Sequence, residues 1–157
     1  MNPKQALELA AANYLAGVAT PIASIPSTNI YKGIENTIAI NDEESNTQPQ
    51  TKVLPCIRLV AEGTHSEAVF KTKIYRGILS VTVEADAHNK TAAQFNTMCD
   101  EVFKKFDIVE LAVNMSARTA NFYVLFARII ENGHAINNGD NWENRIAIDI
   151  VYAQADL

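Results

Sequence analysis

One continuous block of the sequence, residues 74–106, joins a long alternating pattern directly to an amphipathic helical pattern. Apolar and polar side chains alternate in its first half, with Leu79, Val81, Val83 and Ala85 on one face and Ser80, Thr82, Glu84 and Asp86 on the other. A period of two is typical of a strand that buries one face and wets the other. The block therefore predicts a sheet with one buried face, followed within a few residues by a helix.

The helix predicted after this strand has a clear start signal. Thr91 and Gln94 stand three residues apart, the spacing of a capping box in which each side chain bonds to the other's backbone. Apolar residues then recur at helical spacing, at Phe95, Cys99, Val102, Phe103 and Phe106. We expect a helix over 91–106 with this stripe buried.

A second helix is predicted at the N-terminus. Asn2 can cap it, and Pro3 suits its first position. Its apolar stripe consists mostly of alanine and is formed by Leu7, Ala10, Ala11, Tyr14, Leu15 and Val18. Pro21 prevents the helix from continuing further.

The segment between this helix and the central block predicts short strands and loops. One or two short strands are expected within 28–40, and residues 41–51 contain no apolar side chain, which predicts an exposed, mobile polar loop. Leu54–Ala61 is a predicted strand, and Gly63–Glu67 a polar turn leading into the strand that ends at Asp86. The pattern of Ile108–Met115 leaves open a short helical turn or a strand-like connector.

Two further strands are predicted at the C-terminal end. Phe122–Ile130 is apolar on both faces at its start, with Phe122, Val124 and Phe126 on one face, which indicates either covering on both sides or an assembly contact. An asparagine-rich turn at 137–141 leads into Trp142–Tyr152. The whole pattern predicts one α+β domain over 1–157, with a mostly antiparallel or mixed sheet of about four to six strands packed by two main helices.

Composition excludes several classes of protein. The 157 residues carry a formal net charge of −5, so the chain lacks the basic surplus with which proteins hold nucleic-acid phosphates tightly. No apolar run approaches the roughly 20 residues that span a bilayer, and no signal peptide is visible. Two cysteines, Cys56 and Cys99, are too few for a disulfide framework and are expected to be buried free thiols in a reducing cytoplasm.

We find no pattern typical of a catalytic, cofactor or metal site. The three histidines, His65, His88 and His134, lack the spacing of metal ligands, and no glycine-rich phosphate loop or glycine-flanked nucleophile is present. The expectation is therefore a protein that is not an enzyme and holds no cofactor or metal.

The charged side chains of the predicted strands allow two interpretations. Glu84, Asp86 and Asp149 are either paired acid–base residues or a solvated sheet face, and their alternation with Ser, Thr and Arg favours the solvated face. Arg128 and Arg145 are candidates to pair with these acids across strands. Lys71, Lys73 and Arg76 are interpreted as rim charges rather than a nucleic-acid site.

Aromatic and asparagine-rich positions favour contact with other proteins over catalysis. Phe122, Phe126 and Trp142 are the candidate interface anchors, with burial in the core as the alternative for all three. Asn46 and Gln48, in the polar loop, are further candidate contacts with a subunit or partner.

The order of these elements, with segments Leu54-Pro55-Cys56-Ile57, Gly77-Ile78-Leu79-Ser80-Val81 and the closing Trp142-Glu143-Asn144-Arg145-Ile146-Ala147-Ile148, resembles the tail-terminator and tail-completion (head–tail joining) proteins of tailed bacteriophages. The resemblance spans nearly the whole chain. It implies α+β subunits that form a hexameric ring, which caps the tail tube and joins the tail to the head, while DNA passes through the lumen without specific binding.

The resemblance also implies a location and partners. The subunit would belong to the tail or neck of a virion assembled in the host cytoplasm, beside the tail tube and head–tail connector proteins. Two alternatives stay open at this point. One is a small adaptor that binds a protein partner through a sheet edge or through residues 41–51, and the other is a small α+β enzyme that uses His88 with Asp86.

Overall fold

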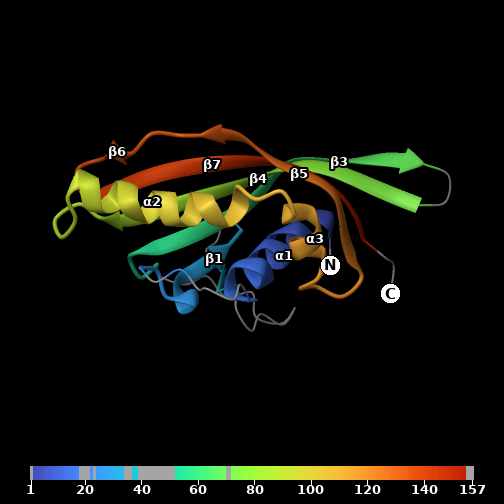
Figure 1. Ribbon diagram of the computed structural model, residues 1–157, viewed down its shortest axis with the longest axis horizontal. Coiled ribbons are helices and arrows are strands. Elements are labelled where there is room, and N and C mark those ends of the chain that lie inside the picture. Colours follow the sequence, from blue (N-terminus) through green and yellow to red (C-terminus); the bar gives the residue numbers. More distant parts are fainter. Residues whose placement is uncertain are drawn as a thin grey trace.

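The computed structural model describes residues 2–17, 22, 24–33, 37–38, 52–69 and 72–154, and it shows a twisted sheet with helices on one face (Figure 1). The elements follow the order α1 (Pro3–Gly17), a 3₁₀ turn (Ser27–Asn29), β1 (Ile30–Lys32), β2 (Thr37–Ile38), β3 (Cys56–Val69), β4 (Thr72–Asp86), α2 (Ala92–Phe106), α3 (Leu111–Ser116), β5 (Phe122–Asn132), β6 (Ile136–Asn137) and β7 (Asn141–Gln154).

The strands lie in the order β2-β1-β3-β4-β7-β5, and the two-residue β6 also pairs with β7, so the described residues form a sheet of seven strands. Among the described strands, only the pairing of β1 with β3 is parallel, and the other pairings are antiparallel. The predicted α+β class, with a mixed sheet and two main helices, is confirmed. The predicted short strands within 28–40 are β1 and β2.

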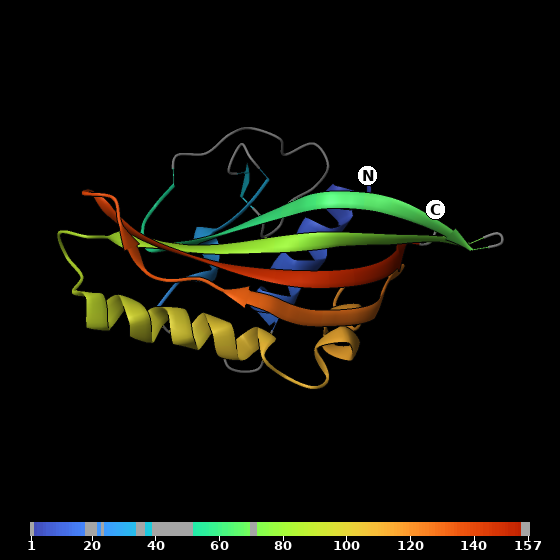
Figure 2. The same cartoon turned by 90° about the horizontal axis from the view of Figure 1, so that it is seen from above.

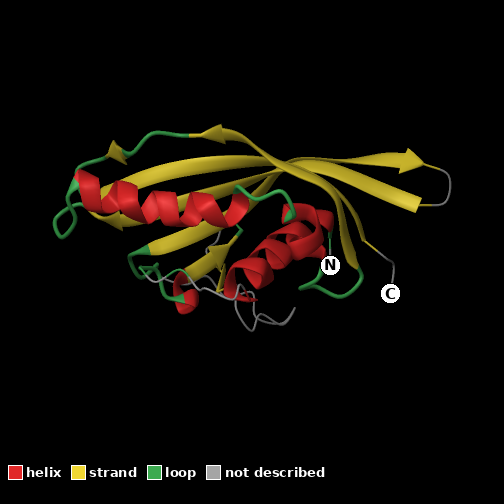
Figure 3. Cartoon of the chain, in the orientation of Figure 1, coloured by secondary structure: helices red, strands yellow, loops and turns green. Residues whose placement is uncertain are grey.

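The helices all lie on one face of the sheet (Figure 3). On β4 this face carries Leu79, Val81 and Val83, each of them fully buried. Seen from above, α1 crosses beneath β3 and β4, whereas α2 lies beside β7 and β5 (Figure 2). Both main helices begin at the predicted caps. Asn2 Oδ1 accepts a hydrogen bond from the backbone N–H of Gln5 at 2.9 Å, and Thr91 and Gln94 form the reciprocal capping box.

The turn predicted at Gly63–Glu67 is wrong, because β3 continues through it to Val69. The pairing with β4 shifts register between Glu62 and His65, and Gly63 has a φ of +59°. A glycine in this left-handed conformation lets the strand accommodate an extra residue as a bulge and then resume pairing. The hairpin of β3 and β4 therefore projects beyond the rest of the sheet, at the right of Figure 1.

The connector after α2 takes the helical alternative. The short α3 packs against β5 and α1, and Ser116 Oγ accepts a hydrogen bond from the backbone N–H of Val124 at 2.8 Å. The predicted polar loop at 41–51 lies outside the described residues. Within the described part of the chain, no helix has the length and apolar character needed to cross a bilayer.

Candidate assembly surface

Strand β5 forms one edge of the sheet, and within the described chain it pairs only with β7. Four apolar side chains of this strand are strongly exposed, namely Tyr123 (53%), Leu125 (56%), Phe126 (42%) and Ile130 (47%). Natural proteins usually protect edge strands, and clustered exposed apolar residues mark interaction sites. The edge at β5 is therefore the strongest candidate for a contact with another chain.

Two bulges in β5, at Leu125 and at Ile130, contribute to this exposed cluster. Val124 pairs with Tyr152 and Phe126 with the next residue, Val151, so that Leu125 is an extra residue in the ladder. Because side chains alternate with a period of two, one extra residue moves those that follow to the opposite faces. The prediction that Phe126 shares a face with Phe122 and Val124 is therefore wrong, and Ala127 and Ile129 pack against the core instead.

The three candidate aromatic anchors lie in different environments. Phe122 is 2% exposed, and its ring stacks on Tyr152 with centroids 5.0 Å apart, so it packs inside the subunit. The partly exposed Trp142 stacks on Phe95, and its Nε1 donates a hydrogen bond to the backbone oxygen of Lys90 at 2.9 Å. Only Phe126 is strongly exposed. The other two candidate contacts, Asn46 and Gln48, lie outside the described residues.

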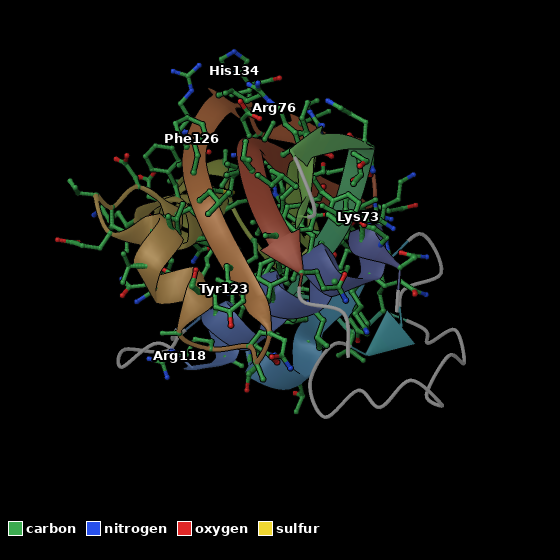
Figure 4. The ribbon with its side chains drawn as sticks, turned by 90° about the vertical axis from the view of Figure 1, so that its right-hand side faces the viewer. Lys73, Arg76, Arg118, Tyr123, Phe126 and His134 are labelled. Atoms are coloured by element: carbon green, nitrogen blue, oxygen red, sulfur yellow. The ribbon has the colours of Figure 1, made fainter. Side chains whose placement is uncertain are left out.

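A cation lies over the exposed aromatic ring. The Arg128 guanidinium carbon is 5.8 Å from the centre of the Phe126 ring, within cation–π range. Among the described residues, Arg128 has no carboxylate within ion-pair distance. Asp149 lies opposite Arg128 on β7, but its carboxylate pairs with Arg76 instead. We call Leu125, Phe126 and Arg128 the β5 knob. Figure 4 shows the Phe126 ring projecting from β5 away from β7.

A cleft of about 550 Å³ lies between the start of α2 and the loop that follows β5. It is lined by Ala92, Asn96, Cys99, Asp100, Asn132, Gly133, His134, Ala135, Trp142 and Asn144. Burial raises the pKa of the Cys99 thiol to about 11, so the wall carries a neutral thiol at neutral pH. The exposed Asp100 has no cation within ion-pair distance in the described chain. We call this site the α2–β7 cleft.

The sheet face away from the helices carries cross-strand ion pairs. Glu84 lies 2.7 Å from Lys52 Nζ and 3.3 Å from Arg58 Nε, and both Asp149 oxygens accept hydrogen bonds from Arg76. Glu84 is 4% and Asp149 7% exposed, so the expectation of a solvated face is wrong for both. The long arginine and lysine side chains lie over the sheet and cover these carboxylates.

The prediction that Arg128 and Arg145 pair with Glu84, Asp86 or Asp149 is wrong for the described residues. Arg145 lies 2.9 Å from Glu62 and 3.9 Å from Glu131, and its Nε donates to Ser80 Oγ at 2.6 Å. Glu84 is instead held by Lys52 and Arg58, and Asp149 by Arg76. In the basic cluster, Lys73 is exposed and Arg76 is paired, while Lys71 lies outside the described residues (Figure 4).

The residues of the enzyme alternative are not brought together as a pair. The Asp86 carboxylate accepts hydrogen bonds from the His88 backbone N–H at 2.8 Å and from Asn89 Nδ2 at 2.9 Å, which shapes the turn before α2. The exposed His88 ring lies 3.6 Å from Asp140 instead. Over the described residues, no three His, Cys, Asp or Glu side chains are grouped to hold a metal ion.

Sequence reasoning missed the α2–β7 cleft entirely. Its lining comes from α2 and from residues 132–144, which are adjacent only after folding. The sequence did indicate a contact surface at the β5 knob, because this strand is apolar on both faces. It did not indicate where the bulges in β5 lie.

No protein-family model matches the chain, and no curated protein matches it. Among solved structures, 25 chains match. One belongs to a structure described as the virion of a native gene transfer agent particle. The match covers 97% of this chain and 99% of that chain, with a TM-score of 0.62 and 12% sequence identity. At this identity, the comparison shows that the two chains share a fold along nearly their whole lengths.

Proposed function

We propose that this chain is a structural virion subunit, a tail terminator that forms a hexameric ring with copies of itself. The ring caps the tail tube and joins the tail to the head. The observation that carries the proposal is the end-to-end fold match with a chain of a gene transfer agent virion, which covers 97% and 99% of the two chains. The order of elements along the sequence supports the same assignment.

The surfaces of the subunit support a role in assembly. The β5 edge exposes four large apolar side chains, as expected of a surface that another chain covers. A net charge of −5 suits the wall of a channel through which DNA passes without being held. In this proposal, the partners are further copies of the chain, the tail tube and the head–tail connector proteins.

The proposal also holds that the protein acts by assembly and turns over no substrate. The carboxylates that the sequence offered for acid–base chemistry all have structural partners, since Glu84 and Asp149 are ion-paired and Asp86 accepts hydrogen bonds within a turn. This arrangement supports a non-catalytic role for them.

The test is assembly on tail tubes. Purified protein is mixed with tail tubes assembled from the tail-tube protein of the same virion and viewed by negative-stain electron microscopy, while light scattering gives the mass of the free protein. We expect one ring at one end of each tube. Tubes of an unrelated phage serve as the control and are expected to remain bare. A protein that stays monomeric and leaves its own tubes uncapped contradicts the proposal.

An adaptor is the second candidate, and the exposed β5 edge favours it equally, since an extended peptide can add to such an edge as a further strand. An adaptor binds one partner without forming a ring. The mass of the complex with a captured partner separates the two functions, because a one-to-one complex supports the adaptor and a ring supports the terminator.

A further inference from the structure

The β5 knob and the α2–β7 cleft are complementary surfaces of the same chain. The knob presents an exposed Leu125 and Phe126 with a stacked arginine, and the cleft presents a hollow whose opening carries a carboxylate. We propose that the knob of one subunit inserts into the cleft of a second copy of the chain, with Arg128 facing the partner's carboxylate at position 100. This inference rests on the proposed function and names the contact between neighbours in the ring.

The apolar surface of the knob and the volume of the cleft support the insertion. Leu125 and Phe126 leave 56% and 42% of their surfaces exposed, which is a large apolar area for two adjacent residues. The cleft offers about 550 Å³, within the range of sites that enclose large apolar groups, and Trp142 and Ala135 form part of its wall. An aromatic anchor that fills a pocket at the centre of a contact is the arrangement that dominates binding energy in protein interfaces.

Charge supports the same pairing. Among the described residues, Arg128 has no carboxylate partner and Asp100 has no cation partner, so both charges are available to a second copy of the chain. The stack on Phe126 holds the Arg128 guanidinium beside the apolar anchor before binding. A pre-positioned guanidinium meeting a carboxylate fixes the register of a contact and excludes partners that lack the acid.

The knob cannot fill the cleft of its own chain. Phe126 and Asn132, which lines the cleft, are six residues apart on the same strand, which is roughly 20 Å in extended conformation. The occupant must therefore come from another molecule. A contact between two different patches of identical subunits is heterologous, and such contacts build rings when the rotation between subunits closes.

Photo-crosslinking tests the contact directly. A benzoyl-phenylalanine placed at position 126 is irradiated in the assembled protein, either free or on tail tubes, and the products are mapped by mass spectrometry. We expect crosslinks between chains to peptides within 92–100 and 132–144. The same probe at the exposed Val113 on α3 is the control, and it is expected to leave these peptides unlabelled. Crosslinks from position 126 to other surfaces overturn the proposal.

A charge exchange provides the second test. Arg128→Glu and Asp100→Arg each place like charges together and are expected to weaken self-association by about tenfold, while the double variant recovers most of this loss. Glu110→Lys, an exposed charge reversal beyond the C-terminal end of α2, is the control and is expected to leave association unchanged. Circular dichroism confirms folding of each variant. If the loss of self-association in the double variant equals the two single losses combined, the pairing of Arg128 with Asp100 is overturned.

The outcomes for this contact and for the proposed function are distinguishable. Rings on tail tubes whose crosslinks map elsewhere overturn only the knob-and-cleft contact. Absence of any assembled state, free or on tubes, overturns the proposed function and this contact together.

Discussion

The Glu8 carboxylate on α1 accepts a hydrogen bond of 3.0 Å from the backbone N–H of Ala61 in β3. This contact lies just past the end of β1, where Lys32 pairs with Leu59 and the backbone N–H of Gly33 donates to the Leu59 oxygen at 2.9 Å. Beyond the end of β1, a side chain of α1 thus supplies the hydrogen-bond acceptor for β3 that a neighbouring strand would otherwise provide. It satisfies a backbone donor that would otherwise be left unpaired at the edge of β3.

The position of Glu8 makes the stability of the protein depend on pH. Burial raises the pKa of this carboxyl above its ordinary value of 4.5, despite the opposing effects of the Ala61 hydrogen bond and the charge of Lys32. Below about pH 4.5 the Glu8 carboxyl is protonated in both the folded and the unfolded state, so the cost of burying its charge is absent. Above the folded-state pKa the buried carboxyl is ionised, and this cost is fully present. Stability from this site therefore falls as pH rises through that window. Glu8→Gln keeps an acceptor and is expected to gain stability over the wild type as pH rises, as measured by urea unfolding at several pH values.

Glu8→Leu separates the charge from the hydrogen bond. This variant removes the acceptor and leaves the Ala61 N–H unsatisfied, so it is expected to be about 1–3 kcal/mol less stable than Glu8→Gln at every pH. A Glu8→Gln variant with the same pH profile as the wild type would show that Glu8 does not titrate in this range.

Glu84 and Glu62 are predicted to differ strongly in their contributions to stability. Glu84 is 4% exposed and lies close to two cations, so Glu84→Gln leaves Lys52 and Arg58 without their partner and is expected to cost about 1–3 kcal/mol. Glu62 is exposed, and its pair with Arg145 is open to solvent, so Glu62→Gln is expected to cost no more than about 1 kcal/mol. Chemical unfolding measures both. Equal losses would contradict the different burial of the two pairs.

The sequence predicted elements with strong periodicity and explicit caps. Thr91 with Gln94 and Asn2 with Gln5 are local signals, since each cap needs only residues three apart, and both helices begin there. The alternation of Leu79, Val81 and Val83 likewise predicted the buried face, because period-two burial needs only the strand itself.

The sequence did not predict features that depend on an inserted residue or on distant partners. The bulges after Glu62 and at Leu125 each add one residue to a ladder, and a single added residue leaves no distinct pattern in an apolar strand. The ion pairs of Glu84 and Asp149 depend on which strands become neighbours. The α2–β7 cleft depends on how α2 packs against the end of β5. Local patterns contain none of this information.

Both thiols are predicted to be unreactive in the folded protein. Burial raises the pKa of Cys56 to about 12 and that of Cys99 to about 11, and the charge of Glu84 adds to the effect at Cys56. The reactive thiolate is therefore scarce at pH 8. Since each pKa unit lowers the thiolate fraction tenfold, Cys99 is expected to react roughly 100-fold more slowly than an exposed thiol. Ellman's reagent, applied before and after unfolding, measures this, and Cys56→Ala isolates the signal of Cys99. Rapid reaction of Cys99 in the folded state would show that the cleft wall opens.

Gly133 is predicted to be essential for the junction between β5 and β7 at the α2–β7 cleft. Its backbone N–H donates to the Arg145 oxygen at 2.9 Å, and a Cβ at this position would lie 2.7 Å from that oxygen and 3.1 Å from Asn144 Oδ1. Because the first of these contacts is to backbone, Gly133→Ala must push the two strands apart. The expected loss is about 1–3 kcal/mol, with faster hydrogen exchange at the end of β5. Asn132→Ala, at the exposed neighbouring position, is the control and is expected to stay within about 0.5 kcal/mol of the wild type. A Gly133→Ala variant with unchanged stability and exchange would mean that the loop after β5 shifts freely, so that the cleft has no fixed wall on this side.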